Sequence, residues 1–239
     1  MLRSPSFQPL YKQVYDYLTE RLVSGYWKPS ESLPSEIALA EELGVSQGTV
    51  RKALNQMVVE NLLERRQGKG TYVAEHTQES SLFRFFRLRE PEGESLVPET
   101  RLLSSRRRLA TKIEQHHLSI KANSQIVELI RLRFLLGVPA ILEKVIQPLA
   151  VFPDIDKQPD LCNALYILYQ EKYGISIVSV RDELKATNIP DKYASDLGLP
   201  VGSPVMMVQR SSINIDGRVV EWSEAYCNSD RFVYAVDLK

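Results

Sequence analysis

Polar side chains between positions 47 and 55 have the chemistry needed to read the base edges of duplex DNA. The residues on one face of a predicted helix over residues 47–58, polar except for the glycine, are Gln47, Gly48, Arg51, Lys52 and Asn55. The apolar residues on its opposite face, spaced at i, i+4, i+7 and i+8, are Val50, Leu54, Met57 and Val58. Amide and guanidinium groups can pair with base edges in the major groove. The pattern therefore predicts a helix that contacts DNA.

A second short helix and a tight turn would position these side chains. Ser35 can cap a helix over residues 36–43, and Gly44 can end that helix in the left-handed conformation. Ser46 can then cap the DNA-contacting helix. A helix-turn-helix of this kind places its second helix in the major groove. An amphipathic helix over residues 10–24 would complete the small core.

A glycine-containing hairpin follows the two helices. Residues 61–66 and 71–73 read as its strands, and Gln67-Gly68-Lys69-Gly70 as the connection. The two glycines let the backbone approach a phosphate or a minor groove, and Lys69 supplies positive charge at the tip. The hairpin is typical of the wing of a winged helix-turn-helix.

The motifs of this region are Leu33-Pro34-Ser35-Glu36, Leu39-Ala40, Gly44-Val45-Ser46, Thr49-Val50-Arg51-Lys52-Ala53-Leu54 and Gln67-Gly68-Lys69-Gly70-Thr71-Tyr72-Val73. With them, residues 9–75 resemble the winged helix-turn-helix of the GntR family of bacterial transcription regulators. The resemblance and the polar face together give the candidate DNA-contacting residues Ser35, Ser46, Gln47, Gly48, Thr49, Arg51, Lys52, Arg66, Gln67, Gly68, Lys69 and Gly70.

Two positions depart from the family pattern. Ile37 and Gln47 stand where the family usually has arginine. Arginine favours guanine, whereas glutamine can pair with adenine. We therefore expect an operator that differs from the family's commoner sequence.

Composition limits the function classes. The 239 residues include 30 Lys and Arg against 30 Asp and Glu, so the formal net charge is zero. A non-specific DNA-coating protein would need a broad basic surface, which this balance does not supply. No apolar run approaches the roughly 18 residues of a membrane span, and the N-terminus lacks the hydrophobic segment of a secretory signal. We expect a cytoplasmic protein whose two cysteines, Cys162 and Cys227, are free thiols.

Catalytic groups are not evident in the sequence. It shows no nucleophile–base pair and no metal-ligand spacing, and its three histidines are His76, His116 and His117. We therefore assign no catalytic residue, no metal ligand and no cofactor.

The rest of the chain reads as a linker over residues 76–100 and a second domain over residues 101–239, after a DNA-binding domain over residues 1–75. The linker contains an aromatic segment, residues 82–88, which we expect to dock on the second domain or on a partner subunit. In the second domain, strands over 101–109, 125–134, 139–147, 176–185, 204–215, 218–226 and 232–236 alternate with helices that begin near Thr111, Asp160 and Pro190. Hairpins with interspersed helices predict an α+β domain with a mainly antiparallel sheet.

The motifs of this half include Arg131-Leu132-Arg133, Glu143, Leu165-Tyr166, Val220-Glu221-Trp222-Ser223 and Asp230-Arg231-Phe232. With them, residues 82–239 resemble the effector-binding (UTRA) domain of the HutC subfamily of GntR regulators, which has a chorismate-lyase-like fold. The resemblance implies a small organic effector. The implied effector-binding residues are Phe85, Phe86, Arg131, Arg133, Glu143, Ala164, Leu165, Tyr166, Glu221, Tyr226 and Asn228.

Arg131 and Arg133 are two apart on a predicted strand, so both side chains point to the same face. Glu143 would lie across from them if the intervening loop has an odd number of residues, and on the other face if the number is even. The sequence leaves this register open. It also leaves open whether the arginines bind an anion or form a structural ion pair.

Two departures bear on the effector. Ala164 stands where the family often has serine, and Cys227-Asn228-Ser229-Asp230-Arg231 replaces a segment that often carries an additional arginine. A phosphosugar site would be expected to keep both donors. We therefore expect a smaller or less charged anion, such as a carboxylate.

These features predict a ligand-responsive transcription regulator that acts as a repressor. We expect it to bind a palindromic double-stranded DNA operator as a homodimer, and its effector to shift the population between DNA-bound and released states. Two alternatives stay open. One is an enzyme with chorismate-lyase-like chemistry. The other is an architectural DNA-binding module without an effector.

Overall fold

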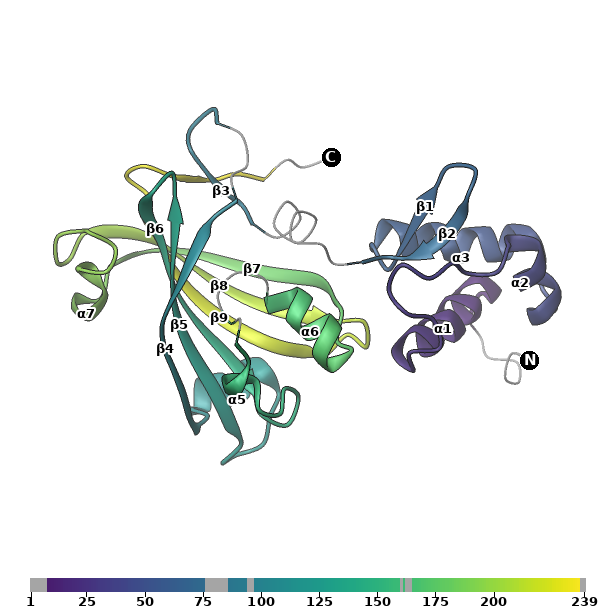
Figure 1. Cartoon of the computed structure of the whole chain (residues 1–239), viewed down its shortest axis with the longest axis horizontal. Coiled ribbons are helices and arrows are strands. Elements are labelled where there is room, and N and C mark those ends of the chain that lie inside the picture. Colours follow the sequence, from purple (N-terminus) through teal and green to yellow (C-terminus); the bar gives the residue numbers. More distant parts are fainter. Residues whose placement is uncertain (1–7, 76–85, 94–96, 160, 162–164, 237–239) are drawn as a thin grey trace. The chain divides into compact units, whose positions relative to one another are not determined.

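The computed structural model describes residues 8–75, 86–93, 97–159, 161 and 165–236. The chain forms two compact units, Met1–Glu75 and His76–Lys239 (Figure 1). Within the described ranges, none of the helices combines the length and apolar character that crossing a membrane requires.

Three helices build the first unit: α1 (Leu10–Val23), α2 (Glu36–Leu43) and α3 (Gln47–Val59). Their buried side chains include Val14, Leu18, Leu39, Val50, Ala53, Leu54 and Met57. The predicted caps are confirmed. Ser35 accepts a hydrogen bond from the Ala38 amide at the start of α2, and Gly44 ends that helix with a φ of 66°.

The predicted wing is the antiparallel pair β1 (Leu63–Arg66) and β2 (Gly70–Val73). Its first strand begins two residues later than expected. Asn61 has a left-handed φ of 55°, and the Leu62 amide still donates to the Met57 carbonyl of α3. The backbone therefore completes the last turn of α3 before it takes up the extended conformation of β1.

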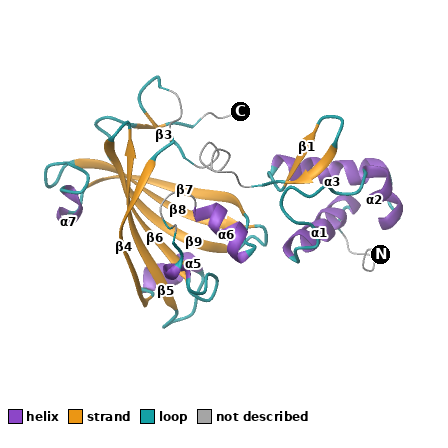
Figure 2. Ribbon diagram, in the orientation of Figure 1, coloured by secondary structure: helices purple, strands orange, loops and turns teal. Residues whose placement is uncertain are grey.

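A six-stranded antiparallel sheet in the order β4-β5-β6-β9-β8-β7 forms the second unit (Figure 2). Its strands are β4 (Glu99–Leu109), β5 (Gln125–Leu135), β6 (Val138–Pro148), β7 (Ile177–Asn188), β8 (Pro204–Asn214) and β9 (Val219–Cys227). The two edge strands, β4 and β7, each carry a β-bulge. A separate pair joins β3 (Leu88–Arg89) to β10 (Val233–Tyr234).

Short helices flank the sheet: α5 (Lys112–Leu118), α6 (Leu165–Tyr173), α7 (Asp191–Ala194) and the 3₁₀ turn η1 (Ile155–Lys157). The predicted capping box of α5 is confirmed, because Thr111 accepts from the Glu114 amide while the Glu114 carboxylate accepts from the Thr111 amide. The α+β class with a mainly antiparallel sheet is thus the observed one.

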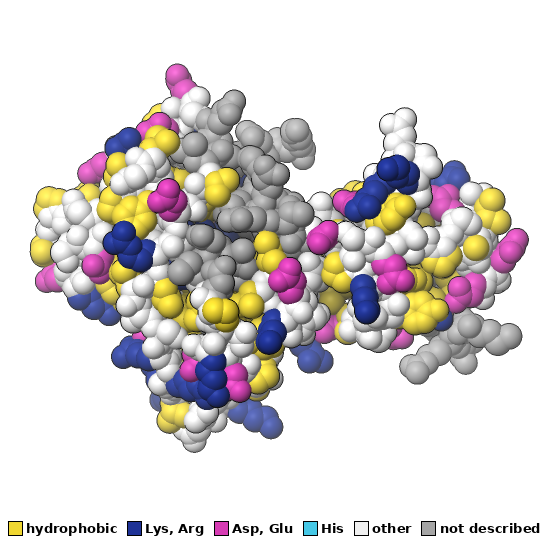
Figure 3. Space-filling model, in the orientation of Figure 1, with side chains coloured by type: hydrophobic (Ala, Val, Ile, Leu, Met, Phe, Trp, Pro, Cys, Tyr) yellow, Lys and Arg dark blue, Asp and Glu magenta, His cyan; other side chains and the backbone are white. Residues whose placement is uncertain are grey.

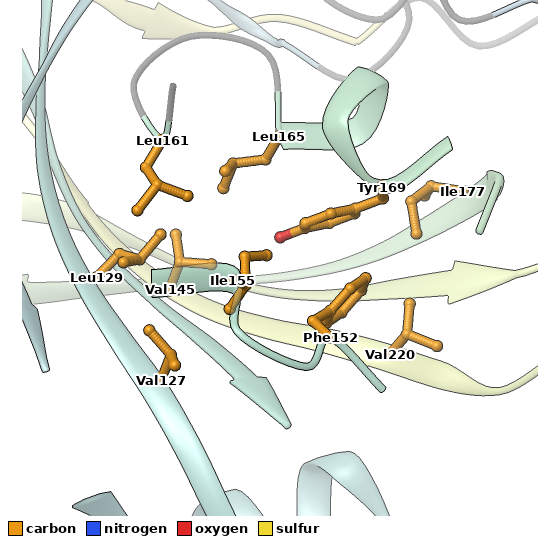
Figure 4. Packing of buried hydrophobic residues seen from close by; sticks show 10 residues of the cluster. All are labelled: Val127, Leu129, Val145, Phe152, Ile155, Leu161, Leu165, Tyr169, Ile177 and Val220. Atoms are coloured by element: carbon orange, nitrogen blue, oxygen red, sulfur yellow. The ribbon is translucent and has the colours of Figure 1, made fainter. Parts of the chain in front are cut away.

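The sheet has two different faces. On one, α6 packs over strand side chains and forms a core of buried residues from β5, β6, β9, η1 and α6. Figure 4 shows the Tyr169 ring among Leu165, Phe152 and Ile177, with its hydroxyl directed inward. On the other face, Leu132, Leu142 and Tyr226 pack with residues of the α7 region, and Trp222 packs near α5.

Several expected boundaries differ from the structure. Leu161 is not helical and α6 begins at Leu165, whereas Asp160, Cys162 and Ala164 lie outside the described residues. The hairpin turn is Leu136-Gly137 instead of Gly137-Val138. The range expected to be a linker contains β3 and the start of β4.

The aromatic segment of that range was expected to dock on the second domain or a partner. Phe86 and Leu88 do dock, in a core cluster of the second unit with Leu135, Ile141 and Phe232. The residues from 82 to 85 lie outside the described part of the chain.

Candidate DNA interface and effector site

The start of α3 is fixed by its cap. The Ser46 hydroxyl oxygen accepts a hydrogen bond from the Thr49 amide at 3.2 Å and lies 2.8 Å from the Thr49 hydroxyl oxygen. The side chains predicted for the polar face are exposed, while Val50, Leu54 and Met57 are fully buried. The helix therefore presents the expected amides and cations to solvent and buries its apolar stripe except for Val58, which is half-buried.

A single carboxylate, that of Glu36, connects the exposed donors. Arg51 Nε lies 2.8 Å from Glu36 Oε2, and Arg65 Nη2 lies 2.9 Å from Glu36 Oε1. Gln47 Nε2 donates to Glu36 Oε2 at 3.3 Å, and Arg65 Nη2 also donates to Asn55 Oδ1 at 2.8 Å. Burial opposes ionisation of Glu36, but hydrogen bonds from Arg51 and Arg65 lower its pKa below the ordinary value. Glu36 and Arg65 were not among the predicted site residues.

Lys52 and Arg66 lie against aromatic rings, and Arg66 also pairs with a carboxylate. Lys52 Nζ lies 4.0 Å from the centre of the Tyr11 ring. The Arg66 guanidinium lies 4.3 Å from the Tyr72 ring centre and 2.5 Å from a Glu64 oxygen. Figure 3 shows Lys and Arg side chains (dark blue) gathered over the β1–β2 hairpin.

The wing tip has the backbone that its glycines predict. Gly68 and Gly70 have φ values of 71° and 118°, in the region that favours glycine. A cleft of about 500 Å³ lies beside the wing, lined by residues 32–36 and 65–71. The predicted residues Ser35, Arg66, Gln67, Gly68, Lys69 and Gly70 all line this cleft, so the structure brings them together.

The open register question in the second unit has a definite answer. The hairpin loop is even, with two residues, yet Glu143 lies directly opposite Arg131. A β-bulge between Arg133 and Phe134 shifts the pairing by one residue and thereby returns Glu143 to the arginine face. Glu143 Oε2 lies 2.6 Å from Arg131 Nη2 and 3.1 Å from Arg133 Nε.

Glu143 is ionised in this arrangement. Burial alone would raise the pKa of its carboxyl, but the charges of Arg131 and Arg133 outweigh burial and lower that pKa to about 2. Arg131 is 2% exposed. The Arg133 side chain is 14% exposed and is hydrogen-bonded only through Nε among the residues that the structure describes. Its terminal nitrogens therefore have donors to offer.

The same sheet face carries more polar groups on β8 and β9. Ser212 Oγ donates to Glu221 Oε1 at 2.9 Å, and the Tyr169 hydroxyl donates to Glu221 Oε2. Because Ser212 uses its proton on Glu221, the Tyr166 hydroxyl, 2.8 Å away, donates to Ser212. Burial raises the pKa of Glu221 above its ordinary value, against the opposing effects of Tyr169 and Arg131. The shift favours the neutral form of this carboxyl.

Arg210 extends this surface toward β7. Its Nε and Nη2 bond both oxygens of Asp182, at 2.7 and 2.6 Å. The Tyr234 hydroxyl from β10 also donates to Asp182. We call Arg131, Arg133, Glu143, Arg210, Asp182, Ser212 and Glu221 the polar row. Arg210 and Ser212 were not among the predicted effector residues, although they too are two apart on a strand, as Arg131 and Arg133 are.

Phe86 borders the polar row. It is 8% exposed, and its ring centre lies 5.7 Å from the Arg133 guanidinium carbon. Leu165 is a core residue, 4% exposed, in the cluster that contains Tyr169. Phe85 and Ala164 lie outside the described residues.

Two other predicted effector residues, Tyr226 and Asn228, have contacts of their own. Tyr226 pairs with Leu142 and packs with it on the opposite sheet face, because neighbouring residues on a strand alternate faces. Its hydroxyl donates to Glu224. Asn228 follows β9, and its side-chain oxygen accepts a hydrogen bond from the Asp230 amide at 3.2 Å. Tyr226 therefore lies on the sheet face opposite the arginines, and a role of either residue in effector binding stays a prediction.

Comparisons with known proteins agree with the family predicted for each half of the chain. Residues 10–73 match the profile of bacterial regulatory proteins of the gntR family, and residues 93–233 match that of the UTRA domain. The Escherichia coli (strain K12) mannosyl-D-glycerate transport/metabolism system repressor MngR is 30% identical over 230 residues, covering 96% of this chain and 95% of the relative. The Klebsiella aerogenes histidine utilization repressor is 41% identical over 75 residues, 31% of each chain.

Solved structures share the fold. The ligand-binding domain of a GntR-family transcriptional regulator from Bordetella bronchiseptica superposes with a TM-score of 0.59 at 25% identity, covering 65% of this chain and 98% of that one. PhnF from Mycobacterium smegmatis superposes with a TM-score of 0.57 at 21% identity, covering 95% of this chain and 99% of that one.

Proposed function

Because the chain belongs to the GntR family of bacterial regulatory proteins, in the HutC subfamily with a UTRA domain, we propose that it is a transcription repressor whose DNA affinity responds to a small anionic metabolite. DNA binding is assigned to residues 1–75 and effector binding to the polar row of the second unit. Both roles are binding functions, and we assign no catalytic step to either.

The proposed operator contacts follow from the exposed face of α3 and from the wing. Gln47 and Arg51 read base edges, while Lys52 and Lys69 contact phosphates. Gly68 and Gly70 let the wing backbone approach the duplex. Two copies of the chain bind a two-fold symmetric operator as a homodimer.

The effector proposal rests on the unused hydrogen-bond donors of Arg133. Within the described residues, its terminal nitrogens have no hydrogen-bond partner, and its side chain is only 14% exposed. A half-buried guanidinium with unused donors matches a carboxylate, which can accept two parallel N–H bonds. Glu221 adds to the preference, since burial raises the pKa of its carboxyl and so disfavours the charged form that would repel an added anion.

One relative has a name that fits this chemistry. MngR is a repressor for mannosyl-D-glycerate transport and metabolism, and glycerate is a carboxylate. We propose for the present chain an effector that combines a carboxylate with hydroxyl groups, for which Ser212 and Tyr166 are neighbouring polar partners.

The test combines melting and DNA release. A panel of sugar carboxylates, simple carboxylates and phosphosugars is added to the full-length protein, and the melting temperature is measured. An effector present at a hundred times its Kd stabilises by about 2.7 kcal/mol. A carboxylate that raises the melting temperature and releases operator DNA supports the proposal, whereas a response to phosphosugars alone refutes the carboxylate class. Turnover of the stabilising compound would refute the assignment of a binding role only.

A further inference from the structure

Glu36 is positioned at the centre of the DNA-facing surface without itself being a donor to DNA. It is the first residue of α2, where the amide ends of a helix favour a negative charge. Its side chain is 17% exposed, whereas those of Arg51 and Arg65 are 54% and 44% exposed. A largely buried anion therefore holds two outward cations.

The geometry leaves base reading possible. Only the Nε of Arg51 is hydrogen-bonded to Glu36 within the described part of the first unit. The two terminal nitrogens of Arg51 can still pair end-on with guanine O6 and N7. Contact with Glu36 therefore restricts the direction of the guanidinium without using the donors that read a base.

Phosphate attraction is affected differently. The negative charge of Glu36 offsets part of the positive charge of Arg51 and Arg65, and a phosphate that replaced it would leave an unpaired carboxylate beside a second anion. Sequence-independent binding depends on cations neutralising phosphates. The contact with Glu36 thus weakens non-specific DNA binding and leaves sequence-specific binding unaffected.

We propose that Glu36 is a specificity-determining residue, which holds Arg51 and Arg65 against an internal carboxylate and so suppresses binding to non-operator DNA. The inference rests on the proposed reading of DNA by α3 and the wing. It assigns Glu36 a positioning and charge-balancing role instead of a contact with the operator.

The experiment compares Glu36→Gln with wild type in the full-length protein, using fluorescence anisotropy. The probes are a duplex selected from random DNA by the wild-type protein and a shuffled duplex of the same composition, each titrated at several salt concentrations. We expect Glu36→Gln to bind the shuffled duplex about tenfold more tightly near 0.1 M salt, with a log–log salt slope steeper by about 0.9 for each guanidinium that gains a phosphate. Operator affinity changes less, so the ratio of the two affinities falls.

The matched control is Glu42→Gln. This residue is also on α2 and pairs with Arg21 at 3.3 Å, so the variant removes the same charge from a different ion pair. We expect its salt slope on the shuffled duplex to equal that of wild type. An equal effect of Glu42→Gln would overturn the inference in favour of net charge.

A double variant distinguishes the proposed charge effect from a folding defect. In Glu36→Gln/Arg65→Ala, Arg65 is no longer present to contact a phosphate. The salt slope on the shuffled duplex should therefore be smaller by about 0.9 than that of Glu36→Gln. Parallel loss of affinity for both duplexes in Glu36→Gln, or an unchanged slope, would overturn the inference. If the wild-type protein bound both duplexes with equal affinity, the proposed function would be refuted together with this inference.

Discussion

Glu143→Gln should destabilise the second unit by about 3 kcal/mol at neutral pH. Glutamine keeps the shape of the side chain and removes the charge that pairs with the buried Arg131. The carboxyl pKa moves from 4.5 to about 2 in the folded protein, and each pKa unit corresponds to about 1.4 kcal/mol. The result agrees with the roughly 3–5 kcal/mol lost when one partner of a buried ion pair is removed.

The same argument gives a pH dependence. The folded-state pKa of Glu143 is depressed, so its contribution is fully present above the unfolded-state value of about 4.5 and is lost as the pH falls through about 2. The difference in unfolding free energy between wild type and Glu143→Gln should therefore stay constant from pH 7 to about 5. Below that, it should shrink toward zero, because a protonated Glu143 resembles glutamine.

Urea denaturation measures this difference. The sequence has two tryptophans, Trp27 and Trp222, so a Trp27→Phe background leaves the buried Trp222 to report on the second unit alone. Glu90→Gln is the matched control, because Glu90 pairs with Arg231 at 3.3 Å on the surface and should contribute less than about 1 kcal/mol. A Glu143→Gln effect as small as that of the control, or one independent of pH, would refute the reasoning.

Three further outcomes are expected. Arg51→Ala should weaken operator binding by about 1–3 kcal/mol in anisotropy titrations, whereas Lys69→Ala should weaken binding to operator and shuffled duplexes equally; equal losses for both variants on both duplexes would contradict the assignment. Gly44→Ala should lower the stability of the first unit by about 1 kcal/mol, seen as a lower Trp27 melting temperature, because its φ of 66° disfavours a side chain. Arg133→Ala should abolish stabilisation by the carboxylate effector while Tyr226→Phe retains it, and equal responses of the two would count against the polar row as the site.

The first unit was largely predictable because its signals are local. The bounds of α2 were predicted correctly, and α3 is one residue longer than expected. Ser35, Gly44 and Ser46 each act on backbone groups within a few residues of themselves. The ion pair between Glu36 and Arg65 spans 29 residues of sequence, so it depends on the folded arrangement of α2 and β1.

In the second unit, the positions of the strands could be predicted from the sequence, but the order in which the strands pair could not. Asp216-Gly217 correctly marked the β8–β9 turn. Insertion of β9 between β6 and β8, which brings Glu221 toward Glu143, depends on the assembled sheet. The bulge after Arg133 reversed the parity that loop length alone would give, so no count of loop residues could have assigned Glu143 to its face.

Among the residues that the structure describes, β4 and β7 are the border strands of the sheet, and a border strand is where another sheet could add a strand. Both strands expose charged side chains there, with Arg101, Arg106 and Arg107 on β4 and Arg181, Glu183 and Lys185 on β7. Each strand is also distorted by a bulge. Charge and irregular backbone both oppose pairing with the edge of another sheet along these eleven- and twelve-residue strands.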